Sequence, residues 1–81
     1  MIKEVITDKK TSKVSLVIDN GTITLSPKDK VSFKILESEI TGTYCGFEKE
    51  GKIIKAILLN DNDSYWKVNL ISKDIKEISI K

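Results

Sequence analysis

Short segments in which apolar and polar residues alternate recur along this chain, separated by residues that favour turns. Alternation with a period of two is typical of strands that bury one face, and closely spaced turns are typical of all-β folds. The clearest example is residues 14–25, where Asn20-Gly21 is the pair favoured when both residues of a two-residue turn have positive φ. That turn predicts a hairpin with Ile18 opposite Ile23.

The same pattern predicts further strands over residues 2–7, 31–35, 40–47, 53–59, 64–70 and 75–80. Gly42 and Gly46 lie four residues apart in one of them, and glycine within a strand often marks the bend that closes a small sheet into a barrel. The spacing of Ile71, Ile75 and Ile78 also fits a single 3₁₀ turn before the last strand. We therefore expect an all-β, single-domain barrel of five to seven antiparallel strands, with an N-terminal strand or arm at 1–13 and the barrel at 14–80.

The composition excludes several classes of function but does not identify one. The 81 residues suit one small domain with one core. All fourteen basic residues are lysine, the net charge is +2, and histidine is absent. The lone Cys45 has neither a second cysteine nor a histidine with which to form a disulfide or a zinc site, so we expect no metal, no cofactor and a reducing, cytoplasmic setting. No apolar run approaches the length of a membrane span. The lysine- and isoleucine-rich composition suggests an AT-rich phage or mobile-element origin.

Three segments of residues 27–80, at 27–33, 40–48 and 68–80, resemble parts of the small Src-homology-like barrels, including the KOW and Sm-like groups. Residues 27–33, Pro-Lys-Asp-Lys-Val-Ser-Phe, look like the entry into such barrels, and residues 40–48 look like the bent strand that comes next in them. Residues 68–80 are similar to their closing strand, short turn and final strand. The resemblance implies a small β-barrel fold. The residues that form the RNA pocket of Sm-like proteins have no match at Glu50-Gly51 or Lys73-Asp74, so a ring that binds RNA in that way is not implied.

No group of residues predicts catalysis. Glu37 and Glu39 fit a charged turn between strands, because no other catalytic side chain lies near them in sequence. Residues 60–64 have the alternate oxygen ligands of a calcium loop but lack its later glycine and bidentate acid, so they too fit a turn. Cys45 has no neighbouring base to make it a thiolate, and we expect it to be a small buried hydrophobe. We therefore expect neither an enzyme nor a small-molecule substrate.

Aromatic and lysine side chains are the remaining candidates for binding. Adjacent strand residues point to opposite faces, so Trp66, which shares a face with Val68 and Leu70, is predicted in the core, and Tyr65 is predicted to be exposed. Tyr44, between two glycines, fits either exposure over a groove or packing across those glycines. The candidate binding residues are Tyr44, Lys49, Lys52, Lys55, Tyr65 and Lys67.

Two kinds of partner suit these residues. Exposed tyrosines beside lysines form a stacking platform for single-stranded RNA or DNA without sequence specificity. The same aromatic side chains suit a protein partner, or a second copy of the chain joined through an exposed edge strand such as residues 2–7. We favour a protein partner slightly, because the net charge is small and arginine is absent, and keep nucleic acid as the alternative.

Overall fold

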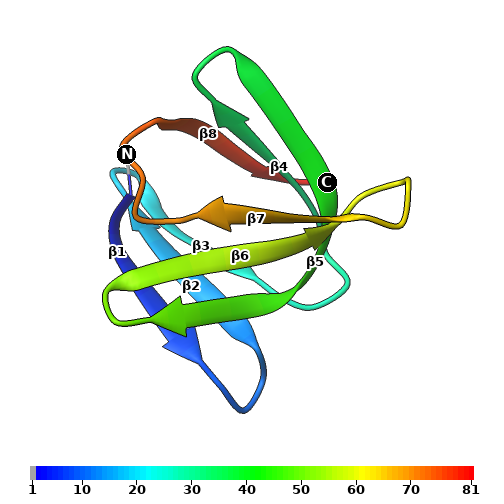
Figure 1. Cartoon of the computed structure of the whole chain (residues 1–81). Helices are drawn as coiled ribbons and strands as arrows, with labels where there is room; N and C mark the ends of the chain where they lie inside the picture. Colours follow the sequence, from blue (N-terminus) through cyan, green and yellow to red (C-terminus); the bar gives the residue numbers. More distant parts are fainter. Residues whose placement is uncertain (1) are drawn as a thin grey trace.

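The computed structural model describes residues 2–81 as two antiparallel β-sheets (Figure 1). Eight strands follow one another along these residues, and no helix occurs among them, which confirms the all-β expectation. The strands are β1 (Ile2–Asp8), β2 (Lys13–Ile18), β3 (Gly21–Leu25), β4 (Lys30–Ile35), β5 (Ser38–Glu50), β6 (Ile53–Leu59), β7 (Tyr65–Asn69) and β8 (Ile75–Ile80).

The first sheet contains β1, β2 and β3 in that order. Its β2–β3 hairpin exists as predicted, but the predicted register is wrong, because Ile18 lies opposite Gly21 and Leu16 lies opposite Ile23. Asp19-Asn20 therefore forms the turn, and Asn20 lacks positive φ, whereas Gly21 takes φ +139°. The slip is two residues, so the apolar side chains stay on the predicted face.

The second sheet has the order β7-β6-β5-β4-β8, so the first and last of its strands along the chain are neighbours. The thirteen residues of β5 pair with β4 through one half and with β6 through the other. A register shift between Tyr44 and Gly46 marks a bulge. Near it, a Cβ built on Gly42 would lie 2.8 Å from the Leu59 carbonyl oxygen, which shows how tightly β5 passes the end of β6. The predicted glycine bend is present.

One hydrophobic core joins the two sheets. It takes Val14, Leu16 and Leu25 from the first sheet, and its largest members are Tyr44 and Phe33 from the second. The Tyr44 hydroxyl donates a hydrogen bond of 2.7 Å to the Ser12 carbonyl oxygen in the β1–β2 turn, so a polar contact also connects the sheets.

Three finer expectations differ from this architecture. The strand pairings form two separate sheets, so the closed barrel is not confirmed, and eight strands replace the expected five to seven. Residues 14–25, expected within the barrel, form the β2–β3 hairpin, whose first strand also pairs with β1. Residues 70–74 form turns and no 3₁₀ helix. One i→i+3 hydrogen bond, from the Ser72 N–H to the Asn69 carbonyl, closes a single turn there.

Candidate interaction surface

Strand β7 lies at an edge of the second sheet and carries two large exposed aromatic side chains. The turn over residues 60–64 precedes it, closed by the Asn60 side chain, which accepts hydrogen bonds from the backbone N–H groups of Asn62 and Ser64. Tyr65 lies opposite Leu59 of β6, and Trp66 lies opposite Leu58. Tyr65 is 63% exposed, as predicted, and Trp66 is 48% exposed.

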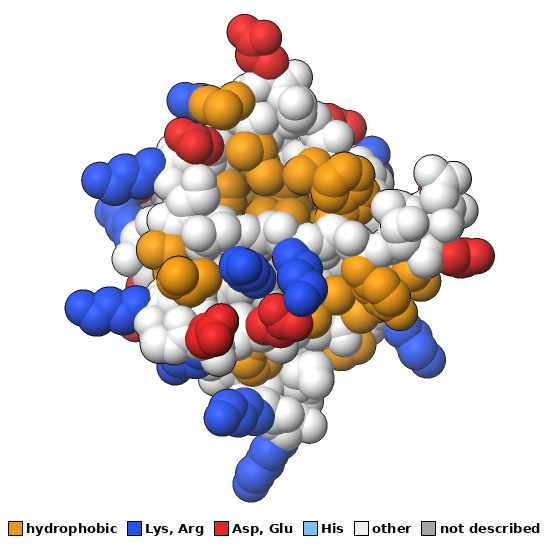
Figure 2. Space-filling model, in the orientation of Figure 1, with side chains coloured by type: hydrophobic (Ala, Val, Ile, Leu, Met, Phe, Trp, Pro, Cys, Tyr) orange, Lys and Arg blue, Asp and Glu red, His pale blue; other side chains and the backbone are white. Residues whose placement is uncertain are grey.

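The exposure of Trp66 corrects its predicted place in the core. Its face was predicted correctly, since Val68 and Leu70, which share it, are buried. Among residues 2–81, however, only β6 pairs with β7, so no further strand of this described part covers the free side of Trp66. Figure 2 shows apolar side chains gathered on this side of the molecule, between β7 and the β4–β5 hairpin. The indole therefore lies at the boundary between core and solvent.

The outer face of β6 and β7 combines an aromatic ring with charges. Lys67 and Tyr65 lie on this face together with Lys55, which is half-buried. The Lys67 ammonium contacts the Glu48 carboxylate at 2.9 Å, and Glu48 also lies opposite Lys55 across β5 and β6. Glu50 lies on the same face two residues further along β5, so two lysines and two glutamates balance on this surface. Figure 2 shows acidic and basic side chains meeting over this part of β6.

The other three candidate residues do not join this surface. Tyr44 is fully buried, because its ring packs in the core and its hydroxyl reaches the Ser12 carbonyl. Of the two positions that fitted its sequence, the packed one is therefore found and the exposed one is not. Lys49 lies opposite Ile54, near the far end of the β5–β6 hairpin, and Lys52 lies in its turn. Leu59 lies seven positions after Lys52, which corresponds to about 23 Å at about 3.3 Å per residue. The six residues therefore do not form one platform.

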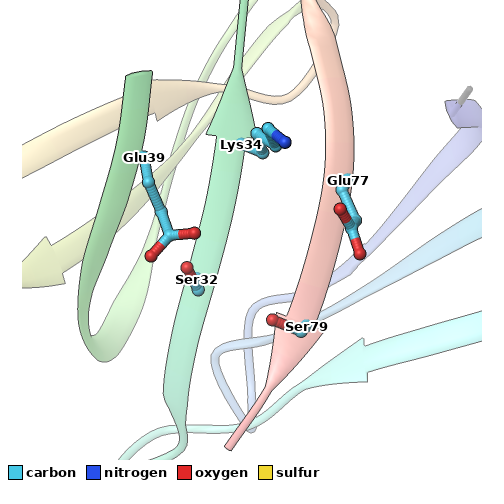
Figure 3. Close-up of a pocket in the computed structure, with 5 residues that line it drawn as sticks. All are labelled: Ser32, Lys34, Glu39, Glu77 and Ser79. Carbon is cyan, nitrogen blue, oxygen red and sulfur yellow. The ribbon is translucent and has the colours of Figure 1, made fainter. Parts of the chain in front are cut away.

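A small polar pocket lies elsewhere, on β4, β5 and β8. Figure 3 shows Lys34 between Glu39 and Glu77, and both carboxylates extend toward the row that contains Ser32 and Ser79. Lys34 lies directly opposite both glutamates in the sheet, an arrangement of opposite charges that stabilises strand pairing. The pocket measures about 70 Å³, whereas small-molecule sites measure roughly 300–1,000 Å³. It has room for about two water molecules.

A larger depression at the tip of the β4–β5 hairpin is open to solvent. Its volume is about 610 Å³, and its lining residues are Leu36, Glu37, Ser38 and Lys76. Glu37 is exposed, as is Glu39 in the neighbouring pocket, and residues 36 and 37 form the hairpin turn. Those glutamates therefore lie in and beside a charged turn, as their sequence suggested.

Cys45 differs from expectation in its environment. It occupies the β5 bulge and is exposed rather than buried, because the extra residue turns its side chain away from the core. Its thiol contacts the Thr43 carbonyl oxygen at 3.4 Å. Within residues 2–81, no three side chains of the metal-binding types cluster into a possible ion site. The same residues contain no helix with the length and apolarity of a membrane span.

Comparison with known proteins adds no relative: no family model, no curated protein and no solved structure matches this chain.

Proposed function

We propose that this protein is a non-catalytic interaction module that binds a protein partner through β7. The observation that carries the proposal is the exposure of both Tyr65 and Trp66 on an edge strand. Tyrosine and tryptophan are enriched among the residues that dominate binding energy at protein interfaces. Here they project from opposite faces of one strand, so a partner that covers this edge contacts both rings.

The charge distribution favours a protein partner over single-stranded nucleic acid. Stacking platforms for nucleic acid combine several aromatic rings with a basic groove. Tyr44 is buried, Lys67 is already paired with Glu48, and Lys52 lies at the opposite end of β6. One tyrosine and a face on which two lysines are balanced by Glu48 and Glu50 remain, which suits a protein surface better than a phosphate backbone.

The small-barrel resemblance forms part of the same proposal. Two observations support it: β4 and β8 are neighbours although they begin and end the segment 30–80, and β5 bends at its glycines. Both are features that bring the ends of a short sheet toward each other. In this proposal, residues 30–80 form the binding module, and the sheet of β1, β2 and β3 packs against it.

Affinity enrichment with matched variants tests the proposed function. The wild type, Trp66→Ala and Tyr65→Ala are compared with Ile6→Ala, which removes an apolar side chain that is 51% exposed on the other sheet. We expect the wild type and Ile6→Ala to enrich the same partner protein. When this partner is purified and its affinity for each form is measured, we expect it to bind Trp66→Ala and Tyr65→Ala at least tenfold more weakly than the wild type. A partner that binds all four forms equally would contradict the proposal.

A fluorescence titration tests the nucleic-acid alternative directly. Trp66 is the only tryptophan, so its emission reports on β7 without a label. The protein is titrated with mixed-sequence single-stranded RNA and DNA at about 50 and 200 mM salt, a range over which phosphate-driven binding weakens steeply. We expect no saturable change. Saturable quenching that is lost at the higher salt would replace the protein partner with nucleic acid.

A further inference from the structure

The backbone of β7 is free along most of one side. Its five residues pair with Lys55 to Leu59 of β6 in consecutive register. On the opposite side, the one backbone hydrogen bond to β7 within residues 2–81 is the bond from the Ser72 N–H to the Asn69 carbonyl at the end of the strand, which leaves the stretch around Tyr65 and Lys67 unpaired. Such a row of unpaired N–H and C=O groups is a template for one more strand.

The other sheet edges are less suited to accept a strand. The pairing of β1 shifts between Ile2 and Glu4, and the pairing of β8 with β4 shifts between Lys34 and Ile35. Bulges of this kind twist an edge away from further pairing. Strand β3 is as long as β7 and pairs as regularly, but it carries no aromatic side chain. Of the edge strands β1, β3, β7 and β8, only β7 combines regular pairing with exposed aromatic rings.

The side chains of β7 indicate what kind of strand fits. Trp66 and Val68 present an apolar face, and Lys67 stands between them on the other face. Residues directly opposite each other across an antiparallel pair share a face, and opposite charges at such positions are favourable. Lys67 is the one charged side chain of β7, so a carboxylate directly opposite it would pair with this lysine from the free side of the strand, while Glu48 contacts it from the side of β6.

A second copy of β7 fits this edge poorly. The antiparallel register that overlaps all five residues places Lys67 opposite the same lysine of the second copy, and like charges directly opposite each other are unfavourable. Moving the register by two residues removes that repulsion but leaves only three of the five residues paired. The charge pattern therefore favours an acidic segment over self-association.

We propose that β7 accepts an extended segment of the partner as an additional antiparallel strand, with the pattern apolar–acidic–apolar opposite Val68, Lys67 and Trp66. The proposal rests on the proposed function and specifies the chemistry of its partner. Main-chain hydrogen bonds supply the affinity in this mode of recognition, and the alternating side chains supply the specificity.

Synthetic peptides test the inference. A ten-residue peptide with Ile-Glu-Val at its centre and Thr and Ser on either side is titrated against the wild type, with Trp66 emission and backbone amide shifts as readouts. A second peptide carries Lys in place of the central Glu. We expect the Glu peptide to bind at least tenfold more tightly than the Lys peptide, and the Lys67→Glu variant to reverse this order.

Two controls separate strand addition from other kinds of contact. Lys76→Glu makes the same charge change at an exposed position of β8 and should keep the wild-type preference. A Glu peptide with N-methyl groups on the amides that face β7 keeps every side chain but loses main-chain donors, so we expect it not to bind. Equal binding of the methylated peptide would overturn strand addition, because side-chain docking alone would then explain the affinity.

The outcomes also distinguish this inference from the proposed function. If neither peptide binds, or if charge at position 67 has no effect on their order, strand addition is overturned. A partner from the enrichment experiment that requires Trp66 would still support the proposed function in that case. If the Glu peptide binds β7 with the expected preference but no partner depends on Tyr65 and Trp66, the edge accepts strands as inferred and the proposed function fails.

Discussion

Replacing Tyr44 with phenylalanine isolates the polar contact between the two sheets. The ring is fully buried, and phenylalanine preserves its packing, so the change removes only the hydroxyl that donates to the Ser12 carbonyl at 2.7 Å. A neutral hydrogen bond contributes about 1 kcal/mol to the free energy of unfolding. Ser12 is half-buried, so water can reach its carbonyl and the cost should not exceed that value greatly. We expect Tyr44→Phe to unfold about 1 kcal/mol more easily.

Urea unfolding followed by Trp66 fluorescence measures this difference. Tyr65→Phe is the matched control, because it removes a tyrosine hydroxyl at a position that is 63% exposed. Surface changes of this kind usually stay within about 0.5 kcal/mol. Equal stability of Tyr44→Phe and the wild type, or equal losses for both variants, would refute the role of Tyr44 as a contact between the sheets.

The buried Tyr44 hydroxyl also makes the stability of the wild type depend on pH, and Tyr44→Phe should lack this dependence. Burial raises the pKa of Tyr44 from 10.0 to about 12. The unfolded chain therefore releases this proton at lower pH than the folded protein, and the stability that Tyr44 contributes is complete below pH 10 and is lost as the pH rises toward about 12. Because phenylalanine has no proton to release, the stability difference between wild type and Tyr44→Phe should shrink over this range. An unchanged difference from pH 9 to 12 would contradict the assigned shift.

Two further substitutions test the packing around β7. Trp66→Ala should lower the free energy of unfolding by about 2.5 kcal/mol, because about half of a tryptophan's roughly 200 Å² is buried and each Å² contributes about 25 cal/mol. A loss of 4 kcal/mol or more, measured by circular dichroism, would return Trp66 to the core. Gly42→Ala should lower the free energy of unfolding by roughly 1–3 kcal/mol through overpacking, since the added Cβ would lie 2.8 Å from the Leu59 carbonyl oxygen. An unchanged urea unfolding curve would show that β5 passes β6 less closely.

Alternation was sufficient to locate the strands but not to fix their partners. Residues 14–25 gave the hairpin and its buried face, yet the register differs by two residues. A period-two pattern is unchanged by such a slip, because Leu16 meets an isoleucine or a leucine on the same face in either register. Turn chemistry had to decide, and Asn20 lacks the positive φ on which the prediction depended, while Gly21 supplies it one residue later.

The candidate surface was predicted in part for a similar reason. Lys55, Tyr65 and Lys67 share the outer face of β6 and β7, as strand periodicity allows one to deduce. The position of Tyr44 depended on a contact with Ser12, thirty-two residues earlier, which no local pattern contains. Sequence alternation assigns faces within a strand, whereas long-range contacts decide which face is covered.

Trp66 demonstrates that the face of a side chain and the element that covers it are decided separately. Its sequence neighbours place it on the inner face, but the sheet ends at β7, so about half of the indole stays in contact with solvent. Closing the sheet beyond β7 would bury Trp66 and pair the free backbone edge at once, because both lie at the same unpaired side. One added strand therefore satisfies two separate requirements of the fold. An acidic residue opposite Lys67 in that strand would add a favourable pair of opposite charges on the outer face.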